Sequence, residues 1–169
     1  FARDCDVITY EFENVPAATA RWLARHAPVL PKPPVLETTQ DRLIEKTFLR
    51  GLGISTVPFA ALNADAELER AAAVTGLPAV LKTRRFGYDG KGQVRVPHLS
   101  QLQDAWQSLQ VVGGPSTVCI LEQQLPLVGE CSVVIARAED GSHTHLPVQR
   151  NPHRSGILAL TEVAPGLVD

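Results

Sequence analysis

Two kinds of hydrophobic period run along this chain of 169 residues, one typical of strands and one typical of helices. Segments in which β-branched, aromatic and other apolar residues alternate with polar ones, or form short apolar runs, predict strands. The segments that fit this description are 5–12, 56–62, 78–83, 93–96, 117–125, 130–138, 143–149 and 156–164. Residues 139–142 join two of them and predict the turn of a hairpin.

Helical spacing predicts helices over 16–27, over 41–53, before Gly76 and over 102–110. Pro16 can begin the first of them, because proline is tolerated at the first helical position. The prolines of segment 29–35 predict extended backbone there. The expected caps of the later helices are Thr38 or Thr39, Asn63 or Asp65, and Ser100, and the expected terminating glycines are Gly51 or Gly53, and Gly76.

The order of these segments predicts an α/β opening, a small α/β unit, and then mostly antiparallel strands. A single doubly wound sheet would keep alternating strand and helix, so pieces of different architecture fit better. We expect three pieces, with boundaries at 1–38, 39–119 and 120–169. The chain starts at Phe1 and stops just after a strand-like run, so we expect it to be a piece of a longer protein.

Composition excludes several classes of function. Hydrophobic residues make up 44% and charged residues 20%, which is typical of a globular soluble protein. A net charge of −2 predicts no attraction to nucleic acid or to a membrane, and no apolar run is long enough for a spanning helix. Cys5, Cys119 and Cys131 lie in apolar segments without zinc-ligand spacing, so we expect buried reduced cysteines and a cytoplasmic protein.

The stretch RRFGYDGKGQ (84–93) carries the first candidate chemistry. Its glycines would let backbone N–H groups approach an anion closely, and the basic residues around it suit a polyphosphate. It lacks the spacing of a Walker A loop, and a strand follows it where a dinucleotide-binding loop needs a helix. The loop alone is compatible with a flexible lid over phosphates and equally with a solvated hairpin turn that carries a few basic residues.

Three charged residues add to this candidate site. Lys82 ends an apolar strand, where a lone ammonium is costly to bury without an anion. Glu122 ends a later strand and Glu130 begins the next. Edge-strand backbone at 122–125 could pair with an adenine edge, and Glu130 could accept from ribose hydroxyls. The alternative is two exposed glutamates at strand ends.

In their order and spacing, Lys82, GYDGKGQ (87–93), EQQL (122–125) and Glu130 resemble the nucleotide-binding half of the ATP-grasp fold. More narrowly, the chain resembles the N5-carboxyaminoimidazole ribonucleotide synthetases. That resemblance rests on TYEFENVP (9–16), QDRLIEK (40–46), GYDGKGQ, GECSVVIARAEDG (129–141) and PVQRNPHRSGIL (147–158). It implies an α/β chain, α+β in the ATP-grasp part, in which the end of a Rossmann-like domain precedes an ATP-grasp fold.

The resemblance also implies roles for individual residues. Tyr88 and Asp89 would face the imidazole substrate and act in catalysis, and Glu11, Glu13 and Asn14 would lie on the substrate side. The implied ATP contacts are Arg42, Lys82, Gly87, Tyr88, Asp89, Gly90, Lys91, Gly92, Gln93, Glu122, Gln123, Gln124, Leu125, Glu130 and His153. The alternatives are a solvated arginine for Arg42 and an exposed histidine for His153.

The implied reaction is the ATP-dependent carboxylation of 5-aminoimidazole ribonucleotide with bicarbonate by a homodimeric enzyme of purine biosynthesis. Mg²⁺ would accompany ATP, with its ligands expected beyond Asp169, and no metal site is expected in this chain, since His143 and His145 lack a third ligand. The alternatives are a glycinamide ribonucleotide transformylase that uses formyl phosphate, a non-catalytic ATP-binding module, and an α/β fragment with no ligand.

Overall fold

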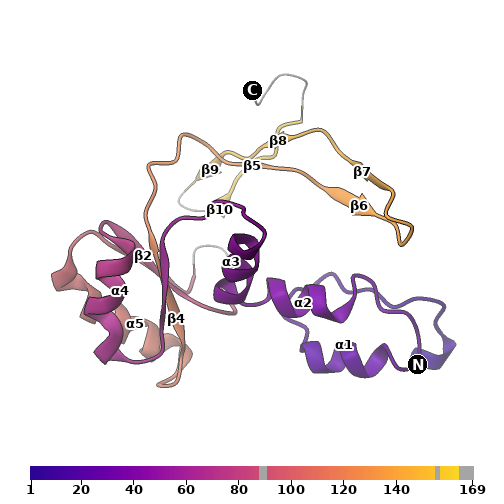
Figure 1. The fold of residues 1–169 in the computed structure, drawn as a ribbon, viewed down its shortest axis with the longest axis horizontal. Helices are drawn as coiled ribbons and strands as arrows, with labels where there is room; N and C mark the ends of the chain where they lie inside the picture. Colours follow the sequence, from indigo (N-terminus) through magenta and orange to yellow (C-terminus); the bar gives the residue numbers. More distant parts are fainter. Residues whose placement is uncertain (88–90, 155–156, 164–169) are drawn as a thin grey trace. The chain divides into compact units, whose positions relative to one another are not determined.

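The computed structural model describes residues 1–87, 91–154 and 157–163, and Figure 1 shows how its helices and strands follow one another. These residues form two compact units. The first comprises the described residues up to 87 together with 92–124. The second comprises 91 and the described residues from 125 onward. Each unit is described by itself.

The first unit opens with a 3-10 turn at Ala2–Asp4 and two short helices, α1 (Ala17–Leu23) and α2 (Pro33–Thr39). Their apolar faces form a small core of Ala2, Ile8, Ala20, Ala27, Val29 and Leu36. The strand predicted over 5–12 is wrong, because Ile8 forms only an isolated parallel bridge to Val29. The extended backbone predicted over 29–35 ends early, because Pro33 fits the first positions of α2, where no backbone donor is needed.

The helix α3 (Arg42–Gly51) follows directly and begins at an acidic cap. Asp41 Oδ1 accepts from the backbone N–H of Leu43 at 2.9 Å and of Ile44 at 3.2 Å. The predicted caps Thr38 and Thr39 are wrong, because both belong to α2 and donate to carbonyls one turn back. A carboxylate at this end also suits the positive end of the helix dipole.

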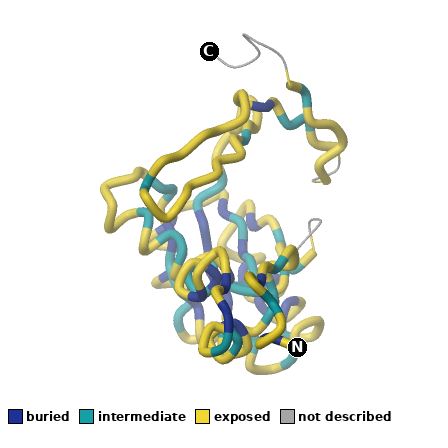
Figure 2. The backbone as a smooth tube through the Cα atoms, turned by 90° about the vertical axis from the view of Figure 1, so that its right-hand side faces the viewer, coloured by how far each residue is buried: buried dark blue, intermediate teal, exposed yellow. Residues whose placement is uncertain are grey.

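A four-stranded antiparallel sheet forms the rest of the first unit, in the order β1-β4-β2-β3. The strands are β1 (Phe59–Leu62), β2 (Ala79–Thr83), β3 (Gln93–Val96) and β4 (Cys119–Gln123). The helices α4 (Leu68–Thr75) and α5 (Leu102–Gly113) pack on it, preceded by 3-10 turns at Asp65–Glu67 and Leu99–Gln101. The shared core includes Leu62, Leu81, Leu121 and Trp106. Buried stretches of the backbone are dark blue in Figure 2.

Two of the expected helix boundaries have different outcomes. Gly76 ends α4 with a φ of +70°, a conformation that glycine adopts without strain, so that prediction is confirmed. Ser100 does not cap α5, because it lies inside the preceding 3-10 turn. Gln101 holds the cap position, without a side-chain hydrogen bond.

The second unit consists of short strands that pair in twos. They are β5 (Cys131–Ser132), β6 (Ile135–Arg137), β7 (His143–His145), β8 (Gln149–Arg150), β9 (His153–Arg154) and β10 (Ile157–Leu158). β5 pairs with β8, β6 with β7, and β9 with β10, all antiparallel. The predicted hairpin at 139–142 is confirmed by β6 and β7, with Gly141 at a φ of +88°.

The three cysteines are free and lie in three different environments. Cys119 is fully buried in β4, and burial raises the pKa of its thiol to about 11. Cys5 is half-buried, and Cys131 is exposed. The expectation that all three are buried is therefore wrong for Cys131, which lies on a two-residue strand with no core beneath it.

Candidate functional site

The glycine loop begins and ends on two paired strands of the first unit. Lys82 of β2 lies opposite Gln93 of β3, and the N–H of Thr83 donates to the carbonyl of Gly92 at 2.8 Å. Gly92 has a φ of +68°, and a Cβ there would lie 2.7 Å from Thr83 Oγ1. Only glycine fits this position, so the third glycine of the motif closes the stem of the loop.

Arg42 ties the start of α3 to this stem. Its guanidinium donates to the carbonyls of Thr83 at 3.0 Å and Gly87 at 3.1 Å. Its backbone N–H donates to the carbonyl of Arg84 at 3.0 Å. The alternative of a solvated arginine is therefore wrong. The Arg42 side chain is half-buried and is hydrogen-bonded to Thr83 and Gly87, where the glycine loop begins.

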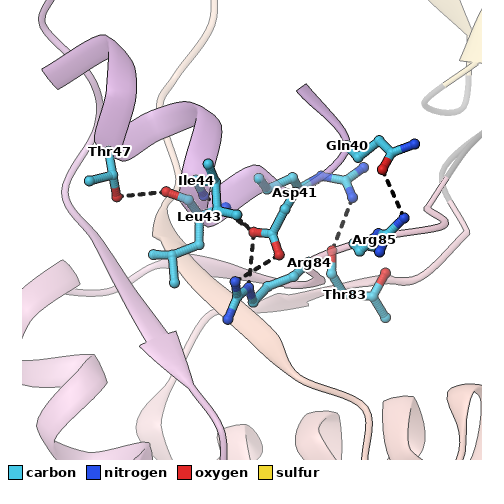
Figure 3. Close-up of polar contacts among 9 residues, drawn as sticks. Gln40, Asp41, Leu43, Ile44, Thr47, Thr83, Arg84 and Arg85 are labelled. Atoms are coloured by element: carbon cyan, nitrogen blue, oxygen red, sulfur yellow. Dashed lines mark hydrogen bonds and ion pairs between the residues drawn. The ribbon is translucent and has the colours of Figure 1, made fainter. Parts of the chain in front are cut away.

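A buried ion pair strengthens the same junction (Figure 3). Arg84 donates from Nε to Asp41 Oδ1 at 3.0 Å, and its Nη2 lies 2.7 Å from Oδ2. Such two-point contact between a guanidinium and a carboxylate is among the stronger hydrogen-bonded pairs in proteins. Asp41 thus serves twice, because the same carboxylate caps α3.

Gln40 completes the junction from the other side. Its side-chain oxygen accepts from Arg85 Nη2 at 3.0 Å, as Figure 3 shows. Its Nε2 donates to the carbonyls of Glu13, at 2.7 Å, and Val15. One buried amide therefore connects the segment that carries the predicted substrate residues to the stem of the glycine loop.

Two lysines share one carboxylate oxygen at the end of β2. Lys82 Nζ lies 2.8 Å from Glu122 Oε2, and Lys46 Nζ lies 3.6 Å from the same atom. Glu122 is only 5% exposed, so the alternative of an exposed strand-end glutamate is wrong for this residue. Glu122 Oε1 is buried and has no hydrogen-bond partner in the described part of the chain.

The segment 122–125 does not lie on a sheet edge, as the sequence led us to expect. β4 is an inner strand, and Glu122 faces Phe59 on one side and Val80 on the other. The next two backbone N–H groups donate to the carbonyls of Pro58, at 3.0 Å, and Pro78, at 2.9 Å. The assignment of 122–125 to adenine remains a prediction, but an edge strand is not its basis.

Glu45 adds an acidic group to the same region. It lies in the first turn of α3 and is half-buried. Burial raises the pKa of its carboxyl, with Lys46 and Arg42 opposing that shift. Arg42, Glu45 and Lys46 thus bring basic and acidic groups together in the first turns of α3.

Glu130 and His153 come together in the second unit. Glu130 Oε2 lies 3.6 Å from His153 Nε2, and Glu130 is about half exposed. His153 Nδ1 lies 2.8 Å from the carbonyl oxygen of Asn151, whose N–H donates to the carbonyl of Glu130 at 2.9 Å. These residues line a cavity of about 430 Å³ together with Leu127, Val128, Gly129, Arg150 and Pro152.

The remaining predicted site residues lie in turns, in the glycine loop or at strand ends. Glu11 and Glu13 are exposed and Asn14 is half-buried, in bends and turns where a strand was expected. Lys91 belongs to the loop motif, Gln93 begins β3, and Leu125 lies two residues beyond β4. Tyr88, Asp89 and Gly90 lie outside the described residues. Phe12 is 61% exposed, whereas Tyr10 packs against the small core.

Sequence reasoning missed Gln40, Asp41 and Lys46 as members of this site. The signal for Lys46 was its spacing of four residues from Arg42, which places both on one face of a helix. Nothing in the sequence indicated that Asp41 would meet Arg84, since the two lie 43 residues apart.

No metal centre is formed by the described residues. Nowhere among them do three or more histidines, cysteines or acidic residues gather closely enough to hold an ion. His143 and His145 are exposed on β7. Within the same residues, none of the helices combines the length and apolar character needed to cross a membrane.

Comparison with known proteins gives two matches to family models. Residues 47–168 match the ATP-grasp domain, and residues 1–40 match the ribonucleotide synthetase preATP-grasp domain. Among curated proteins, the N5-carboxyaminoimidazole ribonucleotide synthase of Pseudomonas aeruginosa is 44% identical over 165 residues. That alignment covers 98% of this chain and 44% of the relative.

Solved structures show the same likeness. The N5-carboxyaminoimidazole synthetase of Staphylococcus aureus complexed with ADP has a TM-score of 0.90 at 33% identity, over 99% of this chain and 43% of that one. The N5-carboxyaminoimidazole ribonucleotide synthetase of Thermus thermophilus has a TM-score of 0.84 at 39% identity, over 100% of this chain and 44% of that one. The chain therefore spans less than half the length of these proteins.

Proposed function

Because the chain belongs to the ATP-grasp family, we propose that it is part of a ligase that carboxylates 5-aminoimidazole ribonucleotide at the expense of ATP. The observation that carries this proposal is the 44% identity, over 98% of the chain, to a synthase of N5-carboxyaminoimidazole ribonucleotide. The family predicted from the glycine loop, Lys82, residues 122–125 and Glu130 is thereby confirmed. The Rossmann-like origin of the first residues stays a prediction.

The proposed reaction solves a problem of leaving groups. Bicarbonate is a poor electrophile because hydroxide leaves badly. An oxygen of bicarbonate attacks the γ-phosphorus of ATP, and ADP leaves with formation of carboxyphosphate. The exocyclic amine of 5-aminoimidazole ribonucleotide then attacks the carboxyl carbon, or CO₂ released from it. Phosphate leaves and the nitrogen loses a proton. A protein accelerates such transfers mainly by positioning the reactants and by neutralising charge.

The first unit would supply cations for the phosphates. Lys82 is the second-last residue of β2, and Arg42 donates to the carbonyls of Thr83 and Gly87, where the loop begins. The backbone of Gly87, Gly92 and Gln93 would offer further donors to the phosphates. Tyr88 and Asp89 would face the imidazole, a role that rests on the resemblance alone. The loop would act as a lid that keeps water from carboxyphosphate.

The second unit would contribute Glu130 and His153. A carboxylate about half exposed beside a cavity of about 430 Å³ can accept hydrogen bonds from ribose hydroxyls. His153 is held by the Asn151 carbonyl with its Nε2 toward Glu130. Both residues would therefore face a nucleotide from fixed positions.

Mg²⁺ would enter bound to ATP, where it neutralises phosphate charge. The described residues hold no cluster of acidic side chains that fits this ion, so we assign no step to metal ligands of this chain. Homodimer formation, expected from the resemblance, and a cytoplasmic location, expected from the cysteines, stay predictions.

Phosphate release tests the proposal. The whole protein that carries this chain is incubated with Mg-ATP and bicarbonate, with and without 5-aminoimidazole ribonucleotide. We expect release to depend strongly on that nucleotide. A parallel reaction with glycinamide ribonucleotide and formate examines the rival transformylase reaction and should release no phosphate.

The outcomes separate the alternatives. Release that depends on glycinamide ribonucleotide and formate would replace the proposed substrate with the rival one. ATP binding without turnover on either substrate would identify a non-catalytic nucleotide-binding module.

A further inference from the structure

Lys46 has an ammonium group that the described part of the chain leaves largely unsatisfied. Its side chain is only 21% exposed, and its one ion pair within the described residues is with Glu122 Oε2 at 3.6 Å. That separation is an ion-pair distance but is too long for a good hydrogen bond. No hydrogen bond to Lys46 Nζ is formed by the described residues. A half-buried ammonium has three donors and is costly to desolvate without acceptors.

The charges around Lys46 do not balance. Lys82 donates to the same Glu122 oxygen at 2.8 Å, so a single carboxylate faces two ammonium groups. Glu45, beside Lys46 in the chain, forms no ion pair with it within the described residues, so Glu122 is the carboxylate that both ammonium groups share. This half-buried cluster has an excess of positive charge and is suited to receive an anion from outside the chain.

The position of Lys46 indicates which anion it would bind, because Lys46 lies near the loop predicted to hold phosphates. Lys46 lies one helical turn after Arg42, on the same side of α3. Lys82 is the second-last residue of β2, and the Arg42 guanidinium bonds to the carbonyl of Thr83, the next residue. Lys46 and Lys82 meet at Glu122, so the three cations lie next to the last residues of the strand that leads into the loop.

We propose that Lys46 is a further phosphate-binding residue, which contacts the ATP phosphates alongside Lys82. The proposal rests on the proposed function, since it names an additional residue for the same ATP. In the ligand-free protein Glu122 holds both ammonium groups in place. When ATP arrives, its phosphates give Lys46 the acceptors that Glu122 cannot supply.

The rival role for Lys46 is purely structural, namely to hold the Glu122 carboxylate in position. The two roles differ in how the effect of a substitution depends on the number of phosphates. Loss of a phosphate contact weakens ATP binding and leaves adenosine binding unchanged. Loss of a residue that only positions Glu122 would alter adenosine and ATP binding to the same extent.

The test is calorimetric titration of the whole protein with Mg-ATP, ADP, AMP and adenosine. We compare the wild type with Lys46→Gln, which removes the charge, and Lys46→Arg, which keeps it. Arg50→Gln is the matched control, because it removes a cation from the same helix, one turn later. The Arg50 guanidinium lies 4.1 Å from the Phe59 ring centre and takes no part in the Glu122 cluster.

We expect Lys46→Gln to weaken ATP binding by roughly 10- to 100-fold, the range of one charge-assisted hydrogen bond. Adenosine binding should stay within about twofold, and Lys46→Arg should recover most of the ATP affinity. Arg50→Gln should bind all four ligands as the wild type does. Because both Lys46 variants are titrated with adenosine, a misfolded variant would be recognised by loss of every ligand.

Three results would contradict the inference. The first is an equal loss of affinity for adenosine and for ATP in Lys46→Gln. The second is an unchanged ATP affinity in Lys46→Gln, and the third is an ATP affinity in Lys46→Arg no higher than in Lys46→Gln. A wild-type protein that fails to bind Mg-ATP would instead overturn the proposed function itself. The two failures are therefore distinguishable.

Discussion

The contact between Gly92 and Thr83 fixes the residue type at the end of the glycine loop. The φ of +68° costs an L-residue about 1–2 kcal/mol, and a methyl group would in addition lie 2.7 Å from Thr83 Oγ1. Gly53 has a similar φ of +77° but nothing within 4 Å of its notional Cβ. The pair therefore separates backbone strain from steric overlap.

We predict that Gly92→Ala lowers the melting temperature more than Gly53→Ala does. Strain alone should lower it by roughly 2–8 °C in a chain of this size, and the overlap with Thr83 adds to that in Gly92→Ala. Thermal unfolding followed by circular dichroism measures both. Adding Thr83→Ala to Gly92→Ala should recover the excess loss, and a double variant as unstable as Gly92→Ala would contradict the steric explanation.

Glu45 predicts a pH dependence whose sign follows from its raised pKa. Because burial disfavours its ionised form, the folded state binds this proton more tightly than the unfolded chain does. The stability that protonated Glu45 contributes is fully present below the pKa that this carboxyl has in the unfolded chain. It is lost as pH rises through the pKa that the carboxyl has in the folded protein. Replacing Glu45 with glutamine removes that loss.

We therefore expect the melting temperature of Glu45→Gln, minus that of the wild type, to increase as pH rises from about 4 to 7. Differential scanning calorimetry at several pH values measures this difference. Glu69→Gln, at an exposed position in the first turn of α4, removes a carboxylate that is not buried and serves as the comparison. A difference for Glu45→Gln that is flat, or that falls with pH, would show that burial is not what governs this carboxyl.

At the scale of elements, α3 is attached to the loop stem by charge as well as by its cap. Asp41 caps the helix and pairs with Arg84, and these roles can be separated chemically. Asparagine is as good a cap as aspartate but cannot form the ion pair. Alanine can do neither.

We predict that Asp41→Ala is less stable than Asp41→Asn by about 1 kcal/mol, the usual worth of a cap. Both should be less stable than the wild type, because Arg84 loses its buried counterion. Urea unfolding of the three proteins measures these differences. Equal stability of the two variants would mean that the cap contributes nothing here.

The sequence predicted elements best where local chemistry alone decides them. Gly76 ended a helix and residues 139–142 made a hairpin turn, because glycine at positive φ needs no distant partner. The strand at 5–12 failed because a strand requires neighbours, and only Val29 meets Ile8. Asp41 was missed as the cap of α3 for a related reason, because Thr38 and Thr39, the caps expected from the sequence, belong to α2.

The candidate site shows the same division. Lys82 and Gly92 could be predicted because they belong to one contiguous motif. The roles of Lys46 and Gln40 could not, because they come from contacts with Glu122, Glu13 and Arg85, which are remote in sequence. An inner strand and an edge strand also have the same sequence pattern, so the position of β4 was beyond prediction.

At the scale of the whole molecule, the chain passes from the first unit to the second between β4 and β5. The connecting backbone forms no helix or strand, and Leu127 and Val128 are highly exposed. Exposed irregular segments are preferred sites of proteolysis. The leucines of the sheet, such as Leu121, are fully buried and protected.

We predict that, among the bonds after leucine, brief chymotrypsin digestion cuts first after Leu127. Mass spectrometry of the fragments identifies the bond, and Leu127→Asn should slow this cleavage without altering the others. A first cut inside β1, β2 or β4 would show that the sheet opens more readily than the connection does.

The bonds made by residues 40–42 bear on how far the ATP-grasp part is an independent module. The two family matches end at residue 40 and begin at residue 47, yet Gln40, Asp41 and Arg42 hold the stem of the loop. A fragment cut at residue 47 would lose these three residues and leave Arg84 without its counterion. The segment matched by the ATP-grasp family model thus omits residues 40–42, which hold the stem of the loop in place. Any recombination that transplants the loop must carry the start of α3 with it.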